Sequence, residues 1–216
     1  TLLTVLTGVC LLGVLAAPWI VQLIAPGFGG DAEKLALTTL LTRIMFPYLL
    51  FIGLAALAMG VLNSIRSFAA PAFSPVIFNI TIIASAFLLA PLFDQPILAV
   101  AVGVVIGGFA QFLIHMPALK KAGLLFGWRF DFAHEGVRRI GWLMAPALIG
   151  LSVTQINILV STILASYFPG GPTYLFYGMR LIHFPLGVFG VALATALLPS
   201  LATQAAKGEL DALRST

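Results

Sequence analysis

Long runs of apolar residues follow one another along the chain, and short polar segments separate them. Six runs reach the roughly 20 residues that a helix needs to cross about 30 Å of hydrocarbon. These runs are Leu2–Ala25, Leu35–Leu62, Ala72–Phe93, Ile97–Met116, Ile140–Phe168 and Thr173–Leu201. None keeps the alternation of apolar and polar residues that a membrane β-barrel requires. The pattern therefore predicts an all-α fold, a polytopic membrane helical bundle with six transmembrane helices.

Composition supports a membrane protein and excludes a water-soluble domain. Of the 216 residues, 61% are hydrophobic and 8% are charged, whereas about a quarter of the residues of a soluble domain are charged. Cys10 is the only cysteine in the sequence. The chain therefore has no internal disulfide and no structural zinc site built from cysteines.

Basic residues concentrate in alternate connections between the runs. Eight of the eleven lie on one side: Arg66, Lys120, Lys121, Arg129, Arg138, Arg139, Lys207 and Arg214. The opposite connections hold only Lys34, and Arg43 and Arg180 fall inside runs. Because positive charge marks cytoplasmic loops, both ends of this segment are expected to be cytoplasmic. The same placement beside apolar runs argues against a nucleic-acid partner, despite the net charge of +4.

One connection is longer than the others and divides the chain. We expect four transmembrane helices in residues 1–116, an interfacial linker in 117–139, two further helices in 140–201 and a cytoplasmic tail in 202–216. Trp128 lies among basic residues in the linker, which suits a short helix at the membrane surface, although an ordinary cytoplasmic loop fits equally well. The start at Thr1 and the polar end suggest a segment of a longer protein, whose remaining helices would be its partners.

Arg180 and His183 are the strongest candidates for a binding site. Arg180 lies two turns inside the sixth run, and His183 and Gly187 follow it on the same helical face at i+3 and i+7. A charged residue within a span is costly and indicates function unless it reaches the surface. Arg180 could instead be an interfacial anchor, and His183 a hydrogen-bonded packing residue. Pro185 is expected to bend the helix beside them.

Arg43 has a simpler explanation. Residues 44–62 already span about 28 Å as a helix, so Arg43 is expected to lie at the outer interface. His115, at the cytoplasmic end of the fourth run, is expected to face the headgroups. Glycines between Gly103 and Gly108 are expected to serve close helix packing.

A second polar face follows the fifth run. Gly150, Thr154, Asn157 and Ser161 recur at helical spacing, and Gln155 lies beside them. These residues could line a cavity, but hydrogen bonds between packed helices explain them equally well.

The sequence offers little for catalysis. It holds no HExxH, GxSxG or phosphate-binding glycine loop, and no intramembrane pair of carboxylates. We therefore expect a membrane transporter rather than an enzyme, with no cofactor; whether a metal binds stays open.

Several strings resemble the MurJ (MviN) lipid II flippase family. Residues 43–51 (RIMFPYLLF), 60–64 (GVLNS) and 71–79 (PAFSPVIFN) resemble its fourth and fifth helices. Residues 145–155 (APALIGLSVTQ) and 177–187 (YGMRLIHFPLG), with 197–199 (LLP), resemble its seventh and eighth. In this order the strings cover nearly the whole chain.

The resemblance implies a fragment, helices three to eight, of a two-lobe fourteen-helix transporter in the multidrug/oligosaccharidyl-lipid/polysaccharide exporter superfamily. It further implies a bacterial inner-membrane protein that moves the undecaprenyl-pyrophosphate-linked peptidoglycan precursor outward by alternating access. Arg180 matches a family arginine considered important in the cavity, whereas His183 stands where many members have an acid. A polysaccharide-repeat flippase or a drug/cation antiporter of the same fold is the alternative.

Overall fold

The computed structural model describes residues 1–124 and 135–190, and these form helices and turns without a strand. The order is α1 (Leu2–Ile24), η1 (Pro26–Gly30), α2 (Ala32–Met45), α3 (Tyr48–Ser64), α4 (Ala69–Leu88), η2 (Ala90–Leu92), α5 (Ile97–Leu113), α6 (Met116–Lys121), α7 (Glu135–Ser166), α8 (Gly171–Pro185) and η3 (Leu186–Gly190). The short elements η1 and η2 are 3-10 helices, and η3 is a π-helix. The all-α prediction is confirmed for these residues.

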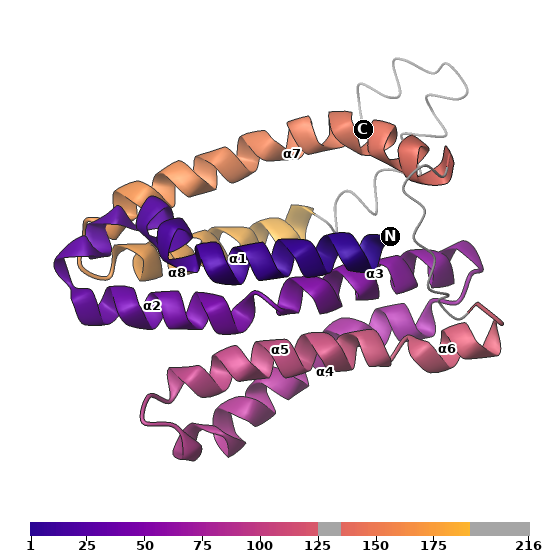
Figure 1. Cartoon of the computed structure of the whole chain (residues 1–216), viewed down its shortest axis with the longest axis horizontal. Coiled ribbons are helices and arrows are strands. Elements are labelled where there is room, and N and C mark those ends of the chain that lie inside the picture. The colour runs from indigo at the N-terminus through magenta and orange to yellow at the C-terminus, as the bar shows by residue number, and fades with distance from the viewer. Residues whose placement is uncertain (125–134, 191–216) are drawn as a thin grey trace.

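The helices run back and forth along one common axis (Figure 1). Five stretches are long and apolar enough to cross a membrane: Leu2–Ile24, Ala32–Ser64, Ala69–Leu88, Ile97–Lys121 and Glu135–Ser166. They correspond to the first five expected spans. The sixth begins as α8, but residues 191–201, with the expected tail 202–216, lie outside the described residues. Trp128 and residues 125–134 of the expected linker also lie outside them.

Small residues form the interior of the first bundle, which we define as α1 to α6. Gly103, Gly107 and Gly108 of α5 are buried, and α5 packs against α2, α3 and α4. A Cβ on Gly103 would lie 2.6 Å from the Cβ of Ser85, and one on Gly108 would lie 2.5 Å from the Tyr48 ring. These contacts confirm the expected role of the glycines in close packing, which replaces hydrophobic burial as the force between membrane helices.

The second expected span is interrupted. α2 ends at Met45 and α3 begins at Tyr48, because Pro47 has no N–H to continue the helix. Phe46 packs its ring against Gly13, where a Cβ would overlap it, and its carbonyl accepts a hydrogen bond from the Cys10 thiol at 3.3 Å. Since Gly13 is the middle residue of α1, the break lies at mid-depth of that helix.

The contact between Phe46 and Gly13 fixes the level of Arg43 relative to α1. Arg43 lies in the last turn of α2, nine residues or about 13 Å beyond Lys34, and its side chain is exposed. It lies close to the level of Gly13, because Phe46 contacts Gly13 and follows Arg43 by three residues. The helices fix the level of Arg43 relative to Gly13 and not relative to a membrane surface, so its outer-interface position stays a prediction.

The expectation that His115 faces the headgroups is wrong, because its side chain is buried. His115 is only 1% exposed at the corner between α5 and α6. Neither ring nitrogen makes a hydrogen bond within the described residues, although the backbone carbonyls of Gln111 and Phe112 are near enough to interact electrostatically. Leu119, one turn further, packs with Ala58 and Leu62 in the same corner. The short α6 continues beyond α5 and contacts α3 beside this corner (Figure 1).

Helices α7 and α8 form an antiparallel pair, which we call the α7–α8 hairpin. It touches the first bundle through α1 and η1, and Figure 1 shows α7 diverging from the bundle away from its turn. Ser166 is the only residue buried in α7. The two regions therefore differ sharply in how much of their surface is covered.

Candidate functional site

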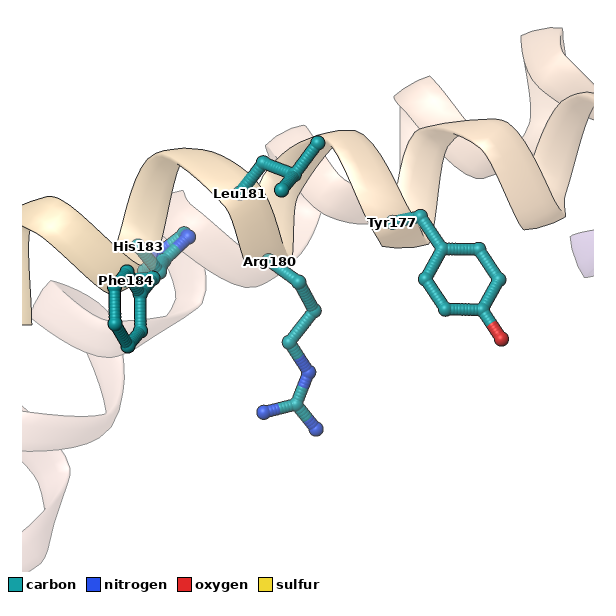
Figure 2. A pocket seen from close by; sticks show the side chains of 5 residues that line it. All are labelled: Tyr177, Arg180, Leu181, His183 and Phe184. Carbon is teal, nitrogen blue, oxygen red and sulfur yellow. The ribbon is translucent and has the colours of Figure 1, made fainter.

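Arg180 and His183 lie together on the exposed side of α8. With Tyr177, Leu181 and Phe184 they line an open hollow of about 530 Å³. Figure 2 shows Arg180 and Tyr177 extending from one side of α8, with Leu181 on the other. The helical spacing of these residues brings them together, as i, i+3 and i+4 neighbours share a face.

The guanidinium of Arg180 has an aromatic neighbour and no acidic one. Its Cζ lies 5.2 Å from the centroid of the Phe176 ring, within cation–π range. The Phe176 ring in turn meets the Tyr177 ring edge to face at 5.7 Å between centroids. No salt bridge to Arg180 occurs among residues 1–124 and 135–190. Its N–H groups therefore stay available to an anionic ligand.

One nitrogen of His183 is already engaged. Nδ1 lies 2.7 Å from the carbonyl oxygen of Met179, one turn earlier, and donates to it. This bond leaves Nε2 facing outward as the nitrogen that can interact with a ligand. Pro185 is the last residue of α8, and the chain continues as the π-helix η3; the expected bend stays a prediction.

The polar face of α7 lies at the same depth. Asn157 precedes the end of α7 at Ser166 by nine residues, and Arg180 follows the start of α8 at Gly171 by nine. Both positions are therefore about 13.5 Å from the turn. By the same count Thr154 and His183 lie about 18 Å from it. The hairpin thus places two pairs of polar residues at matching levels.

No packed neighbour covers these faces within the described part of the chain. Thr154, Gln155 and Asn157 are exposed, and their side chains make no hydrogen bond with another described residue. A Cβ added at Gly187 would meet nothing within 4 Å. Hydrogen bonding between helices, the alternative explanation for this face, has no partner helix among the described residues.

Two contributors to this region escaped the sequence analysis. Phe176 is the i−4 neighbour of Arg180, so helical spacing could have revealed the cation–π contact. Ser166 holds the end of α7 against Gly27, and a contact across 139 residues leaves no local signal. Within residues 1–124 and 135–190 no three His, Cys, Asp or Glu side chains gather as they would around a metal.

Comparisons with known proteins give the family. A family model described as lipid II flippase MurJ matches residues 1–216. The probable lipid II flippase MurJ of Haemophilus influenzae is 42% identical over 215 residues, covering 96% of this chain and 42% of its own length. The lipid II flippase MurJ of Burkholderia cenocepacia is 41% identical over 205 residues, covering 93% and 39%.

The corresponding protein of Vibrio cholerae is 40% identical, and the match covers 100% of this chain and 43% of that protein. The chain thus spans about two fifths of the length of these relatives. With its long apolar helices, it is part of a multi-pass membrane protein. Because the family model covers every residue, this chain belongs to the MurJ lipid II flippase family.

Proposed function

We propose that this chain is the middle part of a transporter that moves lipid II, the undecaprenyl-pyrophosphate-linked peptidoglycan precursor, from the inner to the outer leaflet. Transport would occur by alternating access in the bacterial inner membrane, with both ends of the segment cytoplasmic. Family membership supports the substrate, since the relatives carry the name lipid II flippase. The distribution of basic residues supports the orientation.

The observation that carries the proposal is the guanidinium of Arg180, which lies on an apolar helix and forms no ion pair with another described residue. Arginine binds phosphate oxygens through charge-assisted, often bidentate hydrogen bonds. In the proposed site Arg180 contacts the pyrophosphate, and Phe176 holds the side chain from behind. His183 would donate a second hydrogen bond when Nε2 carries a proton, because Nδ1 already donates to Met179.

Residues of α7 complete the proposed cavity. Asn157 and Thr154 lie at the levels of Arg180 and His183, and with Gln155 and Gly187 they would offer uncharged lining to the sugar headgroup. Neutral amide and hydroxyl groups suit sugar hydroxyls, which both donate and accept hydrogen bonds. The polyprenyl tail would stay among the membrane lipids while the headgroup crosses inside.

The uncovered hairpin also supports the proposed two-lobe, fourteen-helix organisation. Four helices in 1–116 would belong to the first lobe, 117–139 would be the cytoplasmic linker, and 140–201 would begin the second lobe, followed by the tail 202–216. The remaining helices of the full-length protein would then cover the faces of α7 and α8 that are exposed here. No cofactor and no nucleic acid enters this proposal.

The test is Arg180→Ala in the full-length protein, expressed in cells depleted of their own lipid II flippase. We expect loss of growth, with lipid II accumulating in the inner leaflet, at unchanged protein level. Arg180→Lys keeps the charge but not the bidentate geometry, so we expect partial rescue.

Arg138→Ala is the matched control, because Arg138 is an exposed arginine at the start of α7 and should tolerate the change. Normal growth with Arg180→Ala would contradict the assignment of Arg180. If the well-expressed parent protein itself failed to rescue growth, a different exporter of the same fold would be the better conclusion.

A further inference from the structure

The α7–α8 hairpin is joined to the first bundle at one end of the molecule by a defined pair of residues. The backbone N–H of Gly27 in η1 donates to Ser166 Oγ at 3.0 Å. The Ser166 hydroxyl donates in turn to the carbonyl of Ile163 at 2.7 Å. A serine in the last turn of α7 therefore links the hairpin to the loop between α1 and α2.

Gly27 fits this contact because it has no side chain. A Cβ at this position would overlap the Ser166 carbonyl and would lie 2.5 Å from the Tyr167 nitrogen. Both neighbours are backbone atoms, which cannot move aside as a flexible side chain can. Gly29, two residues later in the same turn, has nothing within 4 Å of the corresponding position. Close approach is thus specific to Gly27.

The contact is confined to this end. Ser166 is the only buried residue of α7, and nearly all of the helix from Glu135 to Val160 is exposed. Figure 1 shows η1, η2 and the α7–α8 turn at one end of the molecule, with the α3–α4 loop and α6 at the other. The first end carries Lys34 alone of the described basic residues in the connections, so it is the outer end by the charge rule.

We propose that Gly27 and Ser166 form an outer latch that closes the external end of the cavity and must separate when the headgroup leaves. This inference rests on the proposed transport function and adds the residues that govern outward opening. In the described conformation the latch is closed and the hairpin diverges from the bundle toward the inner end.

The chemistry of the latch suits repeated opening. One uncharged hydrogen bond contributes about 1 kcal/mol net, and water replaces it once the residues part. Gly27 adds a close steric fit to the backbone of Ser166 and carries no charge. By contrast, α5 packs against α2, α3 and α4 and buries its glycines between them, so the separation should occur at the latch.

The experiment measures access from outside, in cells that express the full-length protein. The reporter is Ser161→Cys, five residues or about 7.5 Å inward of Ser166. A membrane-impermeant maleimide is applied externally, and the parent without the reporter corrects for the buried Cys10. The latch is weakened in two ways, by Gly27→Ala, which forces the backbones apart, and by Ser166→Ala, which removes the hydroxyl without adding atoms. Gly29→Ala is the matched control.

We expect both latch variants to raise the labelling rate of Ser161→Cys by about fivefold, which corresponds to the loss of about one hydrogen bond. Gly29→Ala should leave the labelling rate unchanged. Equal labelling in all variants, or an equal rise that includes Gly29→Ala, would overturn the latch. Labelling requires no lipid II, so a failure of the proposed substrate, seen with Arg180→Ala, remains distinguishable from a failure of the latch.

Discussion

The first bundle and the α7–α8 hairpin both contain helices apolar enough to cross a membrane, but the two regions differ in how they are packed. In the bundle, glycines and small residues let helices interlock, as where Gly108 receives the ring of Tyr48. In the hairpin, Gly150 and Gly187 have nothing within 4 Å, and large apolar side chains such as Trp142 are exposed. The buried glycines of α5 therefore serve contacts between helices, whereas Gly150 and Gly187 of the hairpin meet no described neighbour.

The difference shows that apolar composition places a helix in the membrane without deciding what it packs against. Lipid is as apolar as leucine, so close fit and polar contacts decide association. The hairpin keeps its polar residues, Arg180 and Asn157 among them, on surfaces that no described helix covers. The packed region thus serves as support, and the uncovered region carries the proposed site.

The largest expected effect comes from filling a glycine notch in the bundle. Gly108→Leu would drive a side chain into Tyr48 and Phe51, and overpacking of this kind costs about 3 kcal/mol. Gly150→Leu in the hairpin should change the free energy of unfolding by less than about 0.5 kcal/mol, since the site is open. Unfolding by a denaturing detergent, followed by circular dichroism, measures both. Equal losses in the two variants would show that the bundle and hairpin are equally packed.

Histidines allow a second, smaller contrast. His115 is buried with both ring nitrogens lacking a hydrogen bond among the described residues, whereas His183 is exposed and bonded to Met179. An unsatisfied buried polar group costs about 1–3 kcal/mol. We therefore expect His115→Leu to raise the free energy of unfolding by about 1 kcal/mol and His183→Leu to leave it nearly unchanged. The same detergent titration checks this, and destabilisation by His115→Leu would reveal a partner that satisfies the imidazole.

Sequence periodicity and charge were sufficient to predict the helices and their alternation. Apolar runs predict five of the observed spans because span length depends only on bilayer thickness. Charge alternation agrees with the arrangement of the connections, since η1 and the α3–α4 loop lie at opposite ends of the molecule (Figure 1). The break at Pro47 inside the second span was less visible, because proline within a membrane helix can either kink it or end it.

The candidate site was predictable only in part. Helical spacing relates Arg180 to His183, since both lie on one helix, and the structure brings them to one hollow. His115 is buried at a corner where α6 contacts α3, and the contact between Gly27 and Ser166 depends on two distant segments meeting. Such long-range contacts follow from tertiary packing, and local spacing carries no trace of them.

The smallest expected effect contrasts the turns of the two regions. At the end of α3, Arg66 adopts a left-handed conformation with φ of 60°. Ser67 N–H bonds to the Leu62 carbonyl at 2.9 Å, and Arg66 N–H bonds to that of Asn63 at 3.0 Å. This is a Schellman cap, in which glycine is the usual residue at the left-handed position. In the hairpin, Gly170 occupies the corresponding conformation with φ of 71°.

Adding a glycine at Arg66 and removing one at Gly170 should therefore change the stability of the two turns in opposite directions. Arg66→Gly relieves a left-handed penalty of about 1 kcal/mol but adds about 0.5 kcal/mol of backbone entropy loss, so we expect a net stabilisation near 0.5 kcal/mol. Gly170→Ala introduces that penalty and brings a Cβ within 2.9 Å of the Tyr174 ring, which should loosen the hairpin turn. Hydrogen exchange of the two turns resolves the effects locally. We expect slower exchange in the α3–α4 turn of the Arg66→Gly variant and faster exchange in the hairpin turn of the Gly170→Ala variant. If Arg66→Gly speeds exchange instead, the arginine side chain itself must stabilise its turn.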